Sequence, residues 1–150
     1  MRKSLLRLKQ SFVLAFAMLA AIGASAQTQI TDEAGLKAIA NDLAGSYVLA
    51  NDITLSEQWT PISTFTGTLD GAGHAIKGLR IAGGSPTGLF GETDGATIKN
   101  LRVVEAKVAD WGSSKKAGII VGWAKNNTTI EACFTSGVVE GNDHVGGIIG

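Results

Sequence analysis

A two-part pattern that recurs about every thirty residues constrains the fold of this chain more than any other feature. One part has apolar residues at its first and fourth positions and occurs as IKGLRI at 76–81, IKNLRV at 98–103 and, in degraded form, IEACFT at 130–135. The other part is apolar and ends in glycine; it occurs as GLFG at 88–91, IIVG at 119–122 and GIIG at 147–150. The closing glycines Gly91, Gly122 and Gly150 are 31 and 28 residues apart. A period near thirty is typical of repeats built from helical pairs or from β-coils.

The length of the apolar runs decides between these two architectures. Helical repeats need apolar residues at a spacing of 3.6 over about ten residues or more. Here the apolar runs are four to six residues long and alternate with turn-forming clusters such as ETDG at 92–95 and KNNT at 125–128. The pattern therefore predicts an all-β chain in which each repeat is one coil of short strands. Glycine would occupy corners where the backbone needs a left-handed dihedral angle or a close approach.

Stacked coils would bring equivalent positions of successive repeats together, with strands about 4.8 Å apart. From the shared six-residue frame we expect one inward-facing column of Ile76, Ile98 and Ile130. We expect a neighbouring column of Leu79, Leu101 and Cys133, in which the cysteine is a small buried hydrophobe.

The residues before the repeats have a different periodicity. Residues 31–43 are predicted to form a short helix with Thr31 as N-cap, and Gly45 is predicted to end it. Its apolar stripe consists of Leu36, Ile39, Ala40 and Leu43. Alternation over Tyr47–Leu55 predicts one strand. We therefore divide the chain after its leader into a capping-helix segment at 27–45 and a β-repeat domain at 46–150, which we expect to continue beyond Gly150.

The first 26 residues have the three parts of a secretory signal peptide. Basic residues and no acid occupy positions 1–10, an apolar run of eleven residues fills 12–22, and Ala24-Ser25-Ala26 supplies small residues for a signal peptidase. Eleven residues rise only about 16 Å as a helix, roughly half of a hydrocarbon core. We therefore expect cleavage between Ala26 and Gln27, a secreted or cell-surface location and no stable membrane span afterwards.

Charge and cysteine content exclude two classes of protein. Cleavage would remove the four basic leader residues, leaving nine basic residues against thirteen acidic ones, a net charge of −4. A protein that binds nucleic acid needs a basic face, so we expect no nucleic-acid partner. The single Cys133 cannot form an internal disulfide, so the chain is not a disulfide-stapled scaffold.

The four-residue segments resemble those of bacterial GLUG-motif proteins, which are named for Gly-Leu-apolar-Gly. Gly88-Leu89-Phe90-Gly91 matches this motif directly, and VGGIIG at 145–150 is similar to its extended form with Ile for Leu. AGIIVG at 117–122 departs from the pattern at Ile119, which stands where the second glycine would be. The glycines that the resemblance singles out are Gly88, Gly91, Gly118, Gly122, Gly147 and Gly150.

This resemblance covers nearly all of the chain after the leader, because segments 47–53, 59–62 and 65–79 also look like the entry region of the same proteins. It implies a right-handed parallel β-helix on an exported bacterial protein. The motif occurs in large adhesin-like surface proteins and beside IgA-cleaving metallopeptidases, so it marks a fold and a location more than an activity.

The residues that carry chemistry favour no reaction. No HExxH metalloprotease motif, GxSxG elbow or calcium-binding nonapeptide is present, and we expect no catalytic residue, cofactor or metal. His74 and His144 lie in Gly-rich turns, where solvated turn residues are expected. Stacked corners could pair Asp70, Asp94 or Asp143 for acid–base work, although ordinary turn chemistry is favoured.

Three tryptophans are the candidates for ligand binding, because exposed indole rings can stack on sugars; they are Trp59, Trp111 and Trp123. The alternative is that each one covers the core or packs under a loop.

Together these features predict a non-catalytic β-helix module for adhesion or use as a stalk, with carbohydrate or host or cell-surface protein as partner. The alternative is an accessory region of a larger polysaccharide-cleaving enzyme or IgA-type metallopeptidase. We also expect self-association through the C-terminal coil, since 145–150 is uncharged and would present strand edges.

Overall fold

The computed structural model of this protein describes residues 26–84, 86–111 and 116–150. The predicted signal peptide at 1–26 therefore lies outside the described residues, apart from Ala26. The first strand begins at Thr28, two residues after the predicted cleavage site.

Short strands make up most of the described chain, and helical structure is confined to one segment near its start. The helices are α2 (Glu33–Lys37) and the 3₁₀ helix η2 (Ala38–Asn41). The strands are β1 (Thr28–Ile30), β2 (Ser46–Leu49), β3 (Ile53–Thr54), β4 (Thr68–Asp70), β5 (Ala75–Lys77), β6 (Arg80–Ala82), β7 (Phe90–Asp94), β8 (Thr97–Lys99), β9 (Arg102–Asp110), β10 (Lys116–Gly118), β11 (Val121–Lys125), β12 (Thr129–Glu131), β13 (Phe134–Gly141) and β14 (His144–Gly146).

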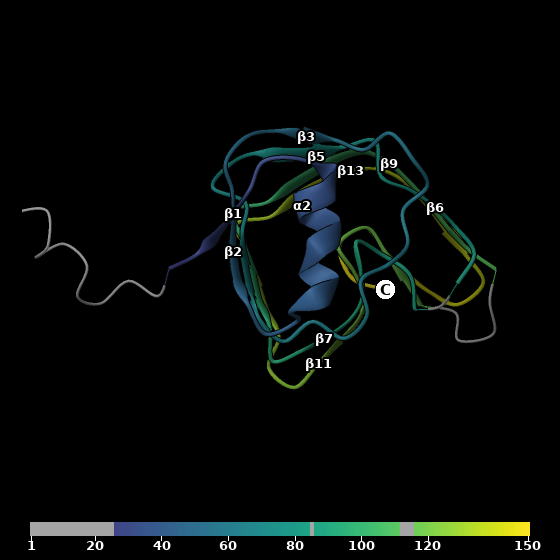
Figure 1. The fold of residues 1–150 in the computed structure, drawn as a ribbon. Coiled ribbons are helices and arrows are strands. Elements are labelled where there is room, and N and C mark those ends of the chain that lie inside the picture. Colours follow the sequence, from purple (N-terminus) through teal and green to yellow (C-terminus); the bar gives the residue numbers. More distant parts are fainter. Residues whose placement is uncertain (1–25, 85, 112–115) are drawn as a thin grey trace, which may run out of the picture.

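The strands form parallel sheets in which neighbours come from successive repeats. One sheet has the order β1-β2-β4-β8-β12, and another has the order β13-β9-β5-β3 with β6 also paired to β9. Strands β7 and β11 form a pair, as do β10 and β14. All of these pairings are parallel. In Figure 1 the paired strands lie one behind another around the space that α2 crosses. The expected all-β class is confirmed.

Register within these sheets brings apolar residues of successive repeats over one another. In the first sheet Tyr47 pairs with Leu69, Leu69 with Ile98, and Ile98 with Ile130. Bridges through the glycine-terminated segments align another column, which consists of Ile62, Phe90, Val121 and Ile149. Since parallel partners point their side chains the same way, each column forms a strip of core, although Ile149 at the end of the second column is 41% exposed.

The expected column of three isoleucines is correct for Ile98 and Ile130 and wrong for Ile76. Ile76 lies in the other large sheet, where it pairs with Ile53 and Val103. Two more residues separate Leu69 from Ile76 than separate Ile98 from Val103, because the corner at 71–74 is longer. The segments IKGLRI and IKNLRV are therefore alike in sequence but are not stacked.

The predicted position of Leu79, in one column with Leu101 and Cys133, is also wrong. Its carbonyl accepts the N–H of Lys107 at 2.7 Å, so it lies beside the second half of β9 and not over Leu101. Cys133 does follow Leu101 in the next repeat, where Phe134 donates its N–H to the Leu101 carbonyl. The Cys133 side chain is half-buried and packs against the core.

The N-terminal helix is shorter than predicted and begins one residue later. Asp32, not Thr31, is the N-cap: its backbone is extended, and its carboxylate accepts the N–H of Gly35 at 2.7 Å. The helix tightens to 3₁₀ geometry from Ala38, where three residues complete a turn. Leu36 and Ile39 therefore stay buried, whereas Ala40 turns outward and is exposed.

The predicted strand at Tyr47–Leu55 is two strands, β2 and β3, joined by a corner. Asn51 occupies this corner and is exposed; its side chain donates to the carbonyls of Thr31 and Asp52. Asp52 holds the corner against the next repeat, since its carboxylate accepts the N–H of Ala75 at 3.0 Å. It also pairs with Lys77 at 2.9 Å. The alternation of apolar residues continues in phase across the corner, so the sequence pattern did not indicate that the strand is interrupted.

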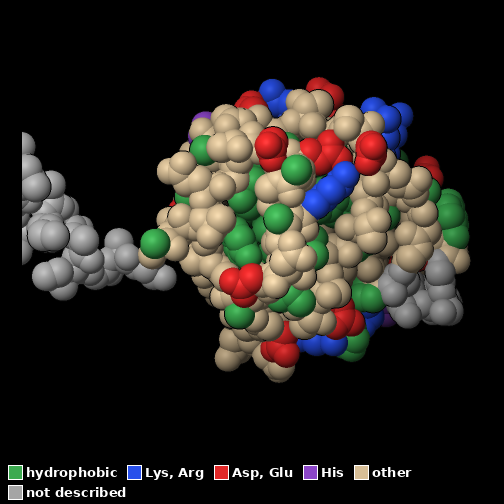
Figure 2. Space-filling model, viewed as in Figure 1, with side chains coloured by type: hydrophobic (Ala, Val, Ile, Leu, Met, Phe, Trp, Pro, Cys, Tyr) green, Lys and Arg blue, Asp and Glu red, His purple; other side chains and the backbone are tan. Residues whose placement is uncertain are grey.

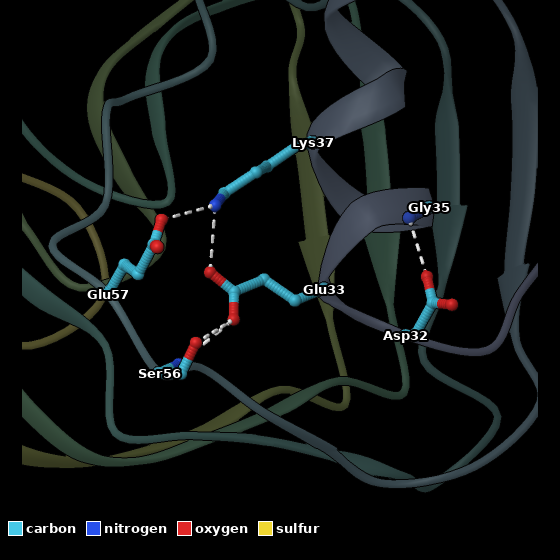
Figure 3. Close-up of polar contacts among 6 residues, drawn as sticks. All are labelled: Asp32, Glu33, Gly35, Lys37, Ser56 and Glu57. Carbon is cyan, nitrogen blue, oxygen red and sulfur yellow. Dashed lines mark hydrogen bonds and ion pairs between the residues drawn. The ribbon is translucent and has the colours of Figure 1, made fainter.

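A polar network ties α2 to the loop after β3 (Figure 3). Glu33 accepts hydrogen bonds from both the N–H and the hydroxyl of Ser56, each at 2.9 Å. Lys37 bridges Glu33 at 2.9 Å and Glu57 at 3.3 Å. The hydrogen bonds from Ser56 and from Lys37 lower the pKa of Glu33 to about 2. On the face that Figure 2 shows, acidic and basic side chains are interspersed.

This network predicts a loss of stability in acid. Because the folded pKa of Glu33 lies below its ordinary 4.5, its carboxylate contributes fully to the free energy of unfolding above pH 4.5. The contribution is lost as the pH falls from 4.5 to about 2. We expect Glu33→Gln to lower the free energy of unfolding at pH 7, with a difference from wild type that shrinks toward pH 2.5.

Denaturant titrations at several pH values measure this difference. Glu57→Gln is the matched control, because the Glu57 side chain is 74% exposed and exposed ion pairs contribute little. A Glu33→Gln difference that is constant from pH 7 to pH 2.5 would contradict the assignment.

Candidate functional site

The three candidate tryptophans occupy three different environments, and Trp59 belongs to the core. Its side chain is 3% exposed, and its Nε1–H donates to the Leu89 carbonyl at 2.9 Å. A ligand has no access to either face of this ring. Trp59 is therefore not available for stacking on a ligand. Its side chain packs in the core beside the segment 88–91.

Trp123 is 40% exposed, but its ring is already in contact with cations. The ammonium groups of Lys116 and Lys125 lie 3.3 Å and 3.8 Å from the ring centroid. Lys125 also pairs with Glu92 at 2.8 Å, and Trp123 and Glu92 are partners in the β11–β7 register. These contacts make Trp123 part of a cation–π cluster rather than an open platform.

Trp111 is the most exposed of the three, at 62%. It directly follows Asp110, the last residue of β9. Ala109 lies two residues before it, and side chains two residues apart along an extended segment share a face. Trp111 is therefore the candidate that keeps an accessible ring at the end of a strand.

A shallow groove of about 660 Å³ lies on the sheet formed by β6, β9 and β13. Its lining combines charged, amide and apolar side chains, namely Gln58, Arg80, Ile81, Ala82, Lys107, Val108, Ala109, Val138 and Glu140. The register explains this composition. Arg80 pairs with Lys107 and Lys107 with Val138, which forms one outward column.

A second outward column consists of Ala82, Ala109 and Glu140. The first two have the smallest side chains that still carry a Cβ, so the surface is hollow beside Arg80 and Lys107. Between the two columns Ile81 and Val108 point inward and are buried. The groove is therefore a consequence of strand alternation and of two stacked alanines.

The electrostatics of the groove are set by Arg80 and Lys107. Both are exposed, and neither forms an ion pair within the described residues. Four other lysines of the described chain do pair with carboxylates: Lys37, Lys77, Lys99 and Lys125. Glu140 lies at the far end of the groove, one strand beyond Ala109.

The six-residue repeat did not indicate this groove, because it aligns residues that are not partners in the sheet. The six-residue repeat places Arg80 over Arg102, whereas the structure places Arg80 over Lys107. Arg102 instead pairs with Ala75 and Phe134. Only the alternation of Arg80, Ile81 and Ala82 could have indicated outward-pointing residues at 80 and 82.

The aspartates considered for acid–base chemistry are not brought together. Asp70 ends β4 and Asp94 ends β7, in different sheets. Asp70 accepts the N–H of Ala72 at 2.8 Å and the side-chain amide of Asn100 at 3.1 Å. Asp94 accepts the amide of Asn126 at 2.8 Å. Asp70 thus bonds its own turn, as the turn hypothesis expected, whereas Asp94 bonds a side chain of the next repeat.

The two histidines each lie near one aspartate. His74 Nδ1 is 3.5 Å from Asp52, a carboxylate already bound by Lys77 and Ala75. His144 is 3.5 Å from its neighbour Asp143, and both are largely exposed. Across residues 26–84, 86–111 and 116–150, no three His, Cys, Asp or Glu residues are grouped to hold a metal ion. Over the same residues no helix has the length and apolar character to cross a bilayer.

Most of the motif glycines lie where backbones approach closely. A Cβ on Gly122 would meet the Gly91 carbonyl and the Pro86 carbonyl carbon at 2.8 Å, and the N of Thr87 more closely still. A Cβ on Gly88 would meet the Gly118 carbonyl at 2.8 Å. Gly147 differs, because its Cβ would meet only the Thr135 hydroxyl, at 3.9 Å. The register pairs Gly118 with Gly146, as the alignment of AGIIVG with VGGIIG in the sequence indicates.

The comparisons with known proteins find that this chain is similar to a segment of Halomucin, but they do not assign the chain to a family. The chain is 35% identical over 145 residues to Halomucin from Haloquadratum walsbyi. The match covers 81% of this chain and 2% of Halomucin, so the chain spans about 2% of that relative's length. No protein-family model matches the chain, and no solved structure matches it significantly. Haloquadratum walsbyi is an archaeon, so the comparison does not support the bacterial origin expected from the GLUG resemblance.

Proposed function

We propose that residues 27–150 form a right-handed parallel β-helix module of an exported surface protein, which acts in adhesion or as a stalk and has no catalytic activity. The observation that carries this proposal is the parallel, in-register pairing of strands from successive repeats in every sheet. Parallel strands need crossover connections, and such crossovers are right-handed in nearly all proteins.

Two further observations support the surface location. The leader is basic, then apolar, and ends in Ala-Ser-Ala, which is typical of exported proteins. The similarity to Halomucin, a surface protein, also favours a cell-surface location. A rigid module of stacked strands suits an extended surface protein, because each repeat needs contacts only to its neighbours.

Export is tested by expressing the full chain with a C-terminal epitope and measuring the intact mass of the exported form. We expect a chain that starts at Gln27 and is accessible to antibody on intact cells or in the medium. Ala24→Leu with Ala26→Leu should block cleavage, since both small residues are replaced. A protein that stays inside the cell with residues 1–26 attached would contradict the proposal.

The non-catalytic part of the proposal has a separate test. The purified chain should release no reducing sugar and no unsaturated product from acidic polysaccharides. Asp70→Asn and Asp94→Asn are the informative variants, because these two carboxylates were the acid–base candidates. Turnover that disappears in either variant would favour the alternative, an accessory or catalytic part of a polysaccharide-cleaving enzyme.

The segment at 129–150 presents apolar side chains to solvent, from which we infer self-association. Its most exposed large apolar residues are Phe134, Val138, Val145 and Ile149, each between 41% and 55% exposed. Strands β12, β13 and β14 are each hydrogen-bonded to a strand of the preceding repeat on one side. Unpaired strand edges favour pairing with a second copy.

We expect the exported chain to form concentration-dependent dimers or larger species through this surface, which sedimentation over a concentration series would measure. Val138→Lys with Val145→Lys should weaken the association, because charged edges oppose strand pairing. Thr54→Lys in β3, at the other edge of the β13-β9-β5-β3 sheet, is the control. A chain that remains monomeric at high concentration would refute this prediction.

A further inference from the structure

Signal cleavage would leave Gln27 as the first residue of the exported chain, directly after Ala26 and directly before Thr28. A glutamine at the start of a chain differs from one inside it. Its free α-amine is a nucleophile, and attack on its own side-chain amide carbon closes a five-membered ring. Before cleavage the same nitrogen belongs to a peptide bond, whose resonance makes it a poor nucleophile. Removal of the leader therefore creates a reactive pair of groups within one residue.

The structure leaves both of these groups accessible. Gln27 is exposed and lies just before β1, whose first paired residue is Thr28, opposite Tyr47. In Figure 1 the start of the described chain reaches β1 from outside the stack of strands. Within the described residues the Gln27 amide forms no hydrogen bond, whereas the Gln58 amide donates to the Ala82 carbonyl at 3.3 Å. No contact in this part of the chain holds the Gln27 side chain away from its own amine.

Ring closure at Gln27 would leave the contacts of β1 intact. The strand is aligned by the residues that follow Gln27, since its register runs from Thr28 to Ile30. The Ile30 carbonyl also accepts the N–H of Ala50 at 2.9 Å. A five-membered lactam is more compact than the open side chain, so it fits the same exposed position.

We propose that the exported chain carries pyroglutamate at position 27, formed when Gln27 cyclises onto its own α-amine. The neutral amine attacks the side-chain Cδ, so that a bond from the α-nitrogen to Cδ forms and the bond from Cδ to Nε2 breaks. Nε2 leaves as ammonia with the proton that the amine gives up. The step involves no oxidant, reductant or second reactant. A free α-amine titrates near neutral pH, so part of it is neutral and nucleophilic there.

The inference rests on the export step of the proposed function, because the reaction needs a chain that starts at Gln27. Its consequence is protection of the exposed end of the module. Strand β1 has three residues and pairs with β2 alone, and its last residue, Ile30, is a core residue with 1% exposure. Exposed termini are preferred sites of proteolysis. A lactam removes the free amine that aminopeptidases bind, so the chain would not be trimmed into β1.

Intact-mass measurement on the full chain, expressed with its leader and recovered after export, tests the proposal. We expect a chain that begins at position 27 and is lighter by one ammonia than the sequence from Gln27 onward. It should have no reactive α-amine and should resist aminopeptidase. Pyroglutamyl peptidase should remove one residue, after which aminopeptidase digestion begins at Thr28.

Two variants separate cyclisation from other causes of a blocked terminus. Gln27→Asn keeps the amide but has a side chain one methylene shorter, which cannot close the five-membered lactam. It should retain its ammonia and its reactive amine, and aminopeptidase should shorten it. Gln29→Asn is the matched control, because the same change at an exposed position inside β1 should leave the terminus blocked.

The outcomes distinguish this inference from the export on which it rests. An exported chain that starts at Gln27 and still has its ammonia and its reactive amine after prolonged incubation at pH 7 would overturn the inference and leave export intact. A blocked terminus in Gln27→Asn would also overturn it, because the block would then have another chemistry. A chain that keeps residues 1–26 would overturn the export step itself.

Discussion

Gly122→Ala is expected to destabilise the protein severely, although it adds only one methyl group. Gly122 lies in β11, and its added Cβ would approach the Gly91 carbonyl and the Pro86 carbonyl carbon at 2.8 Å, and the N of Thr87 more closely. All three are backbone atoms of the preceding repeat, so no side-chain rotation can relieve the overlap. The strands would have to separate, and the Val121–Phe90 and Trp123–Glu92 partners with them.

Overpacking in well-packed cores costs about 1–3 kcal/mol of stability. We expect the cost at Gly122 to reach or exceed the upper end of this range, because the atoms that the added methyl group would meet belong to the backbone. We therefore expect a loss of about 3 kcal/mol or more in the free energy of unfolding, out of the roughly 5–15 kcal/mol typical of a domain. The measurement is a denaturant titration of wild type and variant under identical conditions, with the midpoint of thermal unfolding as a second readout.

Gly147→Ala is the matched control, because it is also a motif glycine and the same methyl group is added. Its Cβ would meet only the Thr135 hydroxyl, at 3.9 Å, and its φ lies outside the left-handed region. We expect a change within about 0.5 kcal/mol, as for surface substitutions that touch no special feature. Equal effects at both glycines would show that close backbone approach is not what the motif glycines provide.

Ile98→Asp is the second substitution with a large expected effect. Ile98 is fully buried at the centre of its column, with Leu69 on one side and Ile130 on the other. The change removes an aliphatic side chain, for which truncation alone costs about 2–5 kcal/mol, and buries a carboxylate without a partner. We expect at least about 4 kcal/mol of destabilisation, enough to leave much of the chain unfolded at 37 °C.

Two further variants separate the contributions. Ile98→Val should cost about 0.5–1.5 kcal/mol, which measures the packing of one methyl group alone. Thr129→Asp introduces the same carboxylate one strand away, at an exposed position paired with Thr97, and should be nearly neutral. Circular dichroism during denaturation measures all three. A folded Ile98→Asp variant as stable as Thr129→Asp would contradict the inward direction of Ile98.

The glycine-terminated segments show what the repeat pattern could predict. Phe90, Val121 and Ile149 occupy equivalent positions of that pattern, and the structure pairs them in one column. Ile98 and Ile130 behave in the same way. These positions were predictable because nearly equal numbers of residues separate them, so similar sequence spacing corresponds to paired positions in the parallel sheets.

Ile76 and Arg80 show where the same reasoning fails. The longer corner at 71–74 shifts the following residues, so Ile76 meets Val103 and Arg80 meets Lys107. A corner can lengthen without altering the apolar pattern on either side, because Ala72 and Gly73 are exposed and the corner makes its own turn hydrogen bond, from the His74 N–H to the Gly71 carbonyl. Similarity between IKGLRI and IKNLRV therefore contained no information on register.

The tryptophans could not be separated from sequence either. Trp59, Trp111 and Trp123 have the same chemistry, yet one is sealed in the core, one is exposed and one lies against two lysines. Their environments depend on contacts that only the fold shows. Trp59 donates to the Leu89 carbonyl, thirty positions away, whereas the two lysines against Trp123 are seven and two positions from it in the chain.

The sequence by itself determined the all-β class, the repeat period and the inward positions of the regularly spaced strands, because alternation and glycine placement act locally. Tertiary structure alone decided the register across the irregular corner and, through it, the cation pair of the groove. The physical reason is that a parallel sheet is held by hydrogen bonds between segments distant in sequence, and its backbone groups pair equally well in several registers. Packing of the whole core selects one of them, and that selection places Arg80 beside Lys107.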